Sequence, residues 1–312
     1  MKNFVKLNSR YISLLFAFSN CLVGCALGFY YGEVSAKTVI VALSIILAGI
    51  GIQALCNYSI SYSRAYQKHR QEKKQGIIAP IMIGGLSLTA LRKRMAVVTL
   101  LTAIFGGISI YLAMGSNIQT LSWFIFISVV CLLLTSVFSI NTENIYENIS
   151  AHVIFFFFSF ASVIGTQLLI LCASHYVVDL YPDTIFISLS AGISSLMVLF
   201  VRSLRTKYRY HKLFRYKLAK IIKYELSTVY IIGLFVGYVI LSVTACITSH
   251  KAIEVVFIVA GYIPMIYLIY KIVKFKDTNN RLKLRLEQLM ACCCINNFVW
   301  ILILIADYCL YL

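Results

Sequence analysis

The chain contains nine apolar runs, and each run is long enough to cross the hydrocarbon core of a bilayer as an α-helix. A transmembrane helix needs about 20 predominantly apolar residues. The runs lie at residues 11–31, 38–56, 95–113, 121–139, 152–173, 184–201, 226–248, 253–272 and 292–311. Hydrophobic residues make up 61% of the sequence and charged residues only 12%, which is too little polar surface for a water-soluble domain. The sequence therefore predicts an all-α, multi-pass integral membrane protein with nine transmembrane helices.

The basic residues indicate how these helices are oriented. Of the 28 Lys and Arg residues, 26 lie at the N-terminus or in the second, sixth and eighth connections, and only Lys37 and Lys251 lie elsewhere. Because cytoplasmic loops are enriched in Lys and Arg, we expect the N-terminus in the cytoplasm and the C-terminus outside. The formal net charge of +17 then reflects topology and contact with anionic lipid headgroups, so we expect no nucleic-acid partner. The composition suits the cell inner (cytoplasmic) membrane.

We expect one membrane domain, residues 1–312, because no Pro-, Ser- or Gly-rich linker divides the chain. The cytoplasmic segments 57–94, 202–225 and 273–291 would cap its cavity. Gly24, Gly28 and Gly32 recur at every fourth residue of the first run. Such a stripe lets a neighbouring helix approach closely, and we interpret it as a packing face within the bundle.

Two polar stripes begin where the runs 38–56 and 184–201 end. The first stripe consists of Asn57, Ser61, Arg64 and Lys68, and the second of Arg202, Arg205, Arg209, Lys212 and Arg215. Steps of three and four residues place each set on one face of a helix. Their similar form suggests two halves of a pseudo-symmetric bundle that face one cavity. The alternative is two solvated stretches that bind lipid headgroups.

Five segments then match a known pattern in order and spacing: RYISLLFAFSNCLVGCALGF, QALCNYSISYSRA, APIMIGGLSLTALRKRM, FFFFSFASVIGTQLL and VLFVRSLRTKYRYHKLFRYKLAK. On these segments the chain resembles the UbiA superfamily of membrane prenyltransferases, most of all the 1,4-dihydroxy-2-naphthoate prenyltransferase branch of menaquinone synthesis. The resemblance covers essentially the whole chain. It implies a nine-helix bundle with a cytoplasmic N-terminus and a cavity for an isoprenyl diphosphate.

The positions that match the family's two metal-binding motifs have lost their aspartates. The first family motif is Asn-Asp-Tyr-Gly-Asp, whereas residues 60–64 read Ile-Ser-Tyr-Ser-Arg. The second is Asn-Asn-Leu-Arg-Asp with a further Asp four residues later, whereas residues 202–206 read Arg-Ser-Leu-Arg-Thr and residue 210 is Tyr. The degenerate motif positions are Asn57, Ser61, Arg64, Arg202, Arg205, Thr206 and Tyr210.

This loss removes the ligands that hold Mg²⁺ in the family that the chain resembles. Mg²⁺ prefers octahedral oxygen ligands and is usually anchored by carboxylates, whereas hydroxyl groups are weak ligands and arginine repels the ion. Glu72 and Glu225 lie outside both motifs, and Glu143 and Glu147 form an alternative cation site in the fourth connection. We therefore expect no metal at the motifs, no cofactor and no catalytic residue.

Basic residues in place of carboxylates would bind phosphate directly, because arginine pairs with phosphate oxygens without a metal. The expected lipid-phosphate-binding residues are Arg64, Lys68, Arg205, Arg209, Lys212 and Arg215. The sequence thus predicts a pseudoenzyme that binds a membrane lipid of the isoprenoid or quinone class, or a scaffold subunit with a protein partner in a membrane complex.

Two other functions remain open. An active prenyltransferase would move an isoprenyl group from a prenyl diphosphate to an aromatic acceptor such as dihydroxynaphthoate, with Arg and Lys holding the diphosphate. Mg²⁺ would be a cofactor only in that case. A transporter or flippase for polyprenyl phosphate would use polar groups inside the membrane, for which the candidates are Gln167, Asn296, Asn297 and Asp307.

Overall fold

The computed structural model describes residues 2–74, 87–115, 122, 125–126, 129, 149–174, 180–210, 224–249, 254–274 and 279–311. Its helices are α1 (Lys2–Tyr31), α2 (Ala36–Lys74), α3 (Leu88–Met114), α5 (Ile149–Ala173), α6 (Pro182–Tyr210), α8 (Tyr224–Thr248), α9 (Val255–Lys274) and α10 (Asn279–Tyr311). None of these residues is in a β-strand. The expectation of an all-α membrane protein is therefore confirmed.

Eight helices in the described ranges are long and apolar enough to cross a membrane, and they match eight of the nine predicted runs. Nearly all of the remaining run, 121–139, lies outside the described residues, so a ninth span stays a prediction. The spanning helix α10 begins earlier than expected, inside the predicted cap 273–291. Leu282, Leu286 and Leu289 are buried and recur with helical spacing, so the apolar face of α10 continues through its charged first turns.

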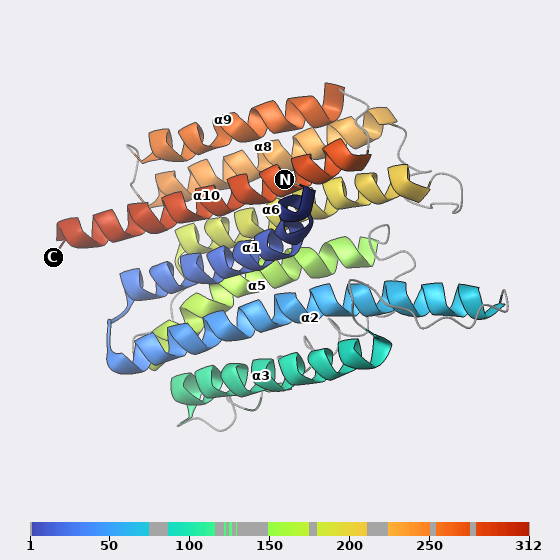
Figure 1. Ribbon diagram of the computed structural model, residues 1–312. Helices are drawn as coiled ribbons and strands as arrows, with labels where there is room; N and C mark the ends of the chain where they lie inside the picture. The colour runs from blue at the N-terminus through green and yellow to red at the C-terminus, as the bar shows by residue number, and fades with distance from the viewer. Residues whose placement is uncertain are drawn as a thin grey trace.

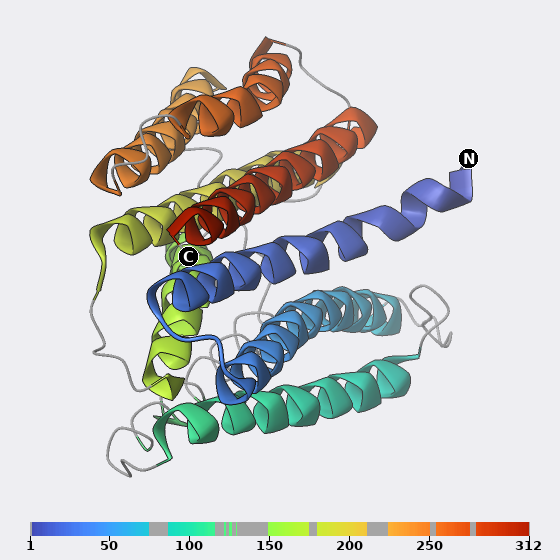
Figure 2. The same cartoon turned by 90° about the vertical axis from the view of Figure 1, so that its left-hand side faces the viewer.

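The helices lie side by side in one elongated bundle (Figure 1). The pair α2 and α3 forms one edge and α9 the other (Figure 2). Between these edges α1 contacts α2, α5 and α10, while α6 contacts α5, α8 and α10. The C-terminal ends of α2 and α6 lie at one end of the bundle, and the C-terminus of the chain lies at the opposite end (Figure 1). Both degenerate motifs are therefore at one end of the bundle.

The glycine stripe of α1 packs against α5. A Cβ atom on Gly24 would collide with the carbonyl oxygen of Val163, and one on Gly28 would lie 2.8 Å from the Cβ atom of Ile170. At these positions the backbone of α1 approaches α5 too closely for any side chain. The interpretation of the stripe as an internal packing face is thus confirmed.

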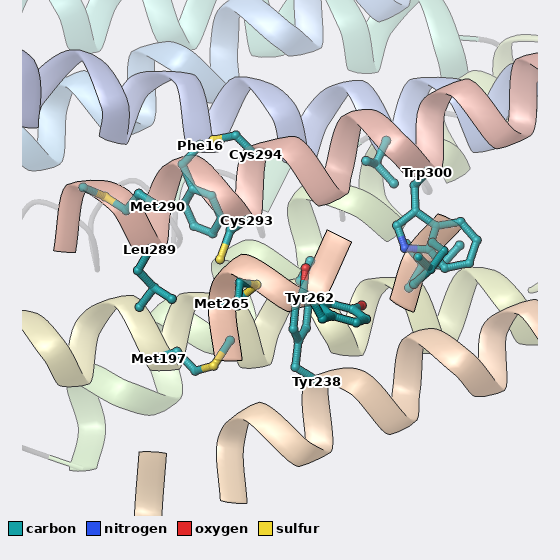
Figure 3. Packing of buried hydrophobic residues seen from close by; sticks show 14 of the residues in the cluster. Phe16, Met197, Tyr238, Tyr262, Met265, Leu289, Met290, Cys293, Cys294 and Trp300 are labelled. Carbon is teal, nitrogen blue, oxygen red and sulfur yellow. The ribbon is translucent and has the colours of Figure 1, made fainter. Parts of the chain in front are cut away.

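The largest buried cluster lies where α1, α6, α8, α9 and α10 meet. Figure 3 shows Met197, Met265 and Leu289 grouped together, with Tyr238 and Tyr262 close by. Cysteines and methionines fill the irregular space between the aromatic rings. This part of the interior is thus closed by side-chain packing.

At the end of the bundle opposite the motifs, two adjacent tyrosines of α1 bind carboxylates on two other helices. The Tyr30 hydroxyl donates to Asp307 Oδ2 of α10 at 2.7 Å, and the Tyr31 hydroxyl donates to Asp183 Oδ2 of α6 at 2.5 Å. Ser249, which follows α8, also donates to Asp183 Oδ2, at 3.2 Å. We call these five residues the tyrosine–carboxylate cluster. It joins α1, α6, α8 and α10 at one point.

The glycine contact makes a specific prediction about stability. We expect Gly24→Ala to lower the free energy of unfolding by about 1–3 kcal/mol, because the new methyl group forces α1 away from α5. The matched control is Gly165→Ala on α5, where an added Cβ atom meets nothing within 4 Å. Thermal unfolding in detergent compares the two variants. Equal melting temperatures for them would show that the close approach does not stabilise the bundle.

A second prediction concerns the tyrosine–carboxylate cluster. Tyr31→Phe should destabilise the protein by about 1–3 kcal/mol, because the buried Asp183 carboxylate loses its shortest hydrogen bond. Tyr111→Phe serves as the control, since Tyr111 is 64% exposed and loses only a hydroxyl. The same melting experiment measures both. A Tyr31→Phe variant as stable as the wild type would contradict a stabilising role for this bond.

Candidate functional site

The first degenerate motif lies on the second half of α2, and the second lies on the last turns of α6. The structure describes the side chains of Asn57, Ser61 and Arg202 at these positions. The predicted residues whose side chains lie outside the described part are Arg64, Lys68, Arg205, Thr206, Arg209 and Tyr210, and Lys212 and Arg215 lie wholly outside it. The helical spacing of the first stripe agrees with a continuous α2 that extends to Lys74.

The helices that carry the two motifs are linked through α1 and α5. Both α1 and α5 contact α2, and α5 also packs along α6. The common cavity that we expect between the two stripes stays a prediction. Several side chains of the first motif lie within the described part of the chain.

Two described polar groups at the first motif make hydrogen bonds within the bundle. The Asn57 amide donates from Nδ2 to Ser13 Oγ of α1 at 3.0 Å, which ties α2 to α1. The Ser61 hydroxyl donates to the Asn57 carbonyl oxygen at 2.8 Å, and Ser61 itself is buried. The Asn57 amide and the Ser61 hydroxyl therefore make helix-to-helix and within-helix hydrogen bonds.

The tyrosine that the first motif retains, Tyr62, is hydrogen-bonded to a basic residue of the neighbouring helix. Arg92 of α3 donates to the Tyr62 hydroxyl from Nε at 2.8 Å and from Nη2 at 2.5 Å. Its Cζ atom lies 5.3 Å from the centre of the Tyr62 ring. Tyr62 is 9% exposed and packs with Leu91, whereas Arg92 is exposed. A guanidinium group thus lies against the retained tyrosine of the first motif.

The described groups at the first motif are poor ligands for Mg²⁺. They are an amide, a hydroxyl and a phenol, and the Arg92 guanidinium donates to the phenol. Mg²⁺ sites in proteins rely on carboxylates. Within the described ranges no three His, Cys, Asp or Glu side chains come together. The adjacent Cys293 and Cys294 point in different directions, with Cys294 toward Phe16 (Figure 3).

Three residues that sequence reasoning passed over are prominent at the two ends of the bundle. In the sequence, Arg92 is one of the basic residues that indicate topology, whereas in the structure it donates to the hydroxyl of the motif tyrosine. Asp183, in the first turn of α6, is buried in the tyrosine–carboxylate cluster. Glu287, at the motif end of α10, is also buried and lies 3.5 Å from Lys283 Nζ. Its spacing of four residues from Lys283 was the available signal, since such pairs meet on a helix.

Three of the four candidates for a transport path link α10 to a neighbouring helix, Asn297 and Asp307 to α1 and Asn296 to α9. Asn297 Nδ2 of α10 donates to Ser19 Oγ at 2.9 Å and to Asn20 Oδ1 at 2.7 Å on α1. Asn296 Nδ2 contacts Met265 Sδ of α9 at 3.3 Å, and Asp307 accepts from Tyr30.

Gln167 on α5 is fully buried, and its amide has no hydrogen-bond partner among the described residues. The contacts of the other three candidates fit static links between helices, so the transporter hypothesis gains no support from them.

No protein-family model matches the chain, and no curated protein matches it. A solved structure does: that of digeranylgeranylglyceryl phosphate synthase, a UbiA-superfamily membrane prenyltransferase. The match has a TM-score of 0.59 at 15% identity and covers 96% of this chain and 99% of that chain. At this identity the likeness establishes the fold, while the dihydroxynaphthoate branch stays a prediction. The chain therefore shares its fold with this membrane synthase.

Proposed function

We propose that this UbiA-like membrane protein binds a long isoprenoid or quinone lipid with an anionic head and does not catalyse prenyl transfer. The fold supports a ligand of this class, because the similar structure is named for an enzyme of digeranylgeranylglyceryl phosphate synthesis. The proposal includes a role as a lipid-binding or scaffold subunit with a protein partner, in the inner membrane.

The observation that carries the proposal is the contact of Arg92 with Tyr62 at the first motif. A guanidinium group has five N–H donors in a fixed plane, and one phenol oxygen accepts from only part of that set. Arginine binds phosphate through paired hydrogen bonds without a metal. The region where Arg92 of α3 meets Tyr62 of α2 therefore suits an anion better than a cation.

Two physical reasons argue against turnover. Breaking the bond to the diphosphate requires strong stabilisation of the departing negative charge, and divalent metal ions normally supply several kcal/mol of it. Arginine supplies part of this stabilisation, but it does not act as a base toward an aromatic acceptor because it stays protonated in proteins. The described donors of the first motif are a neutral amide and a hydroxyl that are already hydrogen-bonded.

A turnover experiment tests the absence of catalysis. The purified chain in nanodiscs is incubated with geranylgeranyl diphosphate and 1,4-dihydroxy-2-naphthoate, in Mg²⁺ and in EDTA, beside a magnesium-dependent UbiA-type enzyme as positive control. We expect no prenylated product from the chain in either buffer. Product in EDTA would instead support a prenyltransferase that uses Arg and Lys to hold the diphosphate. Product only in Mg²⁺ would contradict the conclusion that the motif residues do not suit Mg²⁺.

Lipid analysis tests the binding site itself. Arg92→Gln should reduce the isoprenoid or quinone lipid that co-purifies with the protein about tenfold, the effect of losing one charge-assisted contact of about 1.4 kcal/mol. Tyr62→Phe should keep most of the lipid, because the guanidinium remains. Lys37→Ala, at the opposite end of α2, is the control for a general loss of positive charge.

The same mass spectrometry is applied to Arg205→Ala combined with Arg209→Ala, which tests the second motif. We expect this pair also to lose lipid. An unchanged lipid profile in the Arg92 variant and in the double variant would overturn the basic headgroup site, whatever the turnover experiment shows.

A further inference from the structure

The last helical turns of α9 present an apolar surface that ends in positive charge. In the described bundle α9 contacts α8 and α10 and lies at the edge opposite to α2 and α3 (Figure 1). Four of its large side chains are half or more exposed: Ile263 at 64%, Ile266 at 55%, Tyr267 at 56% and Tyr270 at 50%. Their spacing places them on the outward side of α9, where a membrane protein meets lipid.

Two lysines on this side are held against tyrosines one turn earlier. Lys271 Nζ lies 4.0 Å from the centre of the Tyr267 ring. Lys274 Nζ lies 5.1 Å from the centre of the Tyr270 ring and donates to its hydroxyl at 2.5 Å. Side chains on a helix tilt toward its N-terminus, so both lysines extend back along the apolar surface. The ammonium groups are thereby kept at the depth of the tyrosine rings.

A third cation, Arg285, lies in the early turns of α10, the helix that follows α9 and packs against it. Its Nη1 atom donates to Gln288 Oε1 at 3.0 Å. Interfacial tyrosines are common in membrane proteins, and lysines at a helix C-terminus also favour the helix dipole. Neither tendency by itself holds two lysines against two exposed tyrosines on one apolar surface.

We propose that Tyr267, Tyr270, Lys271 and Lys274 form a binding site for an anionic phospholipid of the surrounding leaflet. The two ammonium groups bind the headgroup phosphate, and the tyrosine hydroxyls donate to its ester oxygens. The acyl chains lie along Ile263 and Ile266. The charge of the site selects an anionic headgroup over a zwitterionic one. This site uses no residue of the degenerate motifs, and it lies on the edge of the bundle opposite to α2, which carries the first motif.

Native mass spectrometry of the full chain tests the site. The protein is purified into micelles that contain equal amounts of phosphatidylglycerol and phosphatidylcholine, and the lipid that remains bound is counted. We expect the wild type to retain phosphatidylglycerol preferentially. Lys271→Gln combined with Lys274→Gln should lower that retention about thirtyfold, the combined effect of two basic groups at an anionic surface.

Two matched variants separate a specific site from a general effect of charge. Lys271→Arg combined with Lys274→Arg should retain the lipid, since the positive charge is kept. Lys93→Gln combined with Arg94→Gln, which removes two exposed charges from α3, should retain it as well. Equal losses in the α3 and α9 glutamine variants would overturn the proposal, as would equal retention of the two lipids by the wild type.

A competition arm identifies the source of the phosphate. Excess geranylgeranyl diphosphate or inorganic phosphate should leave the bound phosphatidylglycerol in place, because its acyl chains contribute to binding. Displacement of the phospholipid by either compound would overturn the assignment to a bilayer lipid.

Discussion

A helix in a bilayer gains little free energy by burying its apolar face against another helix, because the lipid around it is equally apolar. This constraint applies to α1 as to every other helix of the bundle. Close contact and hydrogen bonds must then hold the bundle together. One face of α1 has no side chains at Gly24 and Gly28, so its backbone meets α5 directly. Another face carries Ser19 and Asn20, which accept from Asn297 of α10. The central helix thus uses both means of association.

The sequence predicted those features that one helix determines by itself. Apolar length was enough to place eight described spans, and the spacing of three glycines was enough to identify a packing face. The partners of Tyr31 and Tyr30 were not predictable, because these contacts join residues 152 and 277 positions apart. Such pairs depend on how each helix is rotated, and a uniformly apolar run carries little information about rotation.

The same limit applies to the candidate site. Ser61 stands where the family that the sequence resembles has a metal-binding aspartate, and in the structure its hydroxyl donates to the backbone of α2. No sequence pattern predicts the contact of Arg92 with Tyr62, because the two residues are 30 positions apart and lie on different helices. Buried Glu287 was missed for a related reason: the apolar face of α10 extends into what looked like a charged loop.

Tyr30 and Tyr31 are neighbours in the chain, so their side chains leave α1 about 100° apart, and each is bonded to a carboxylate on a different helix. If α1 were to turn about its axis or slide by one residue, both bonds would break together. These two hydrogen bonds together fix both the rotation and the axial position of α1 at this end of the bundle. A separation of the helices that leaves both bonds intact would have to occur at the other end, where the motifs lie.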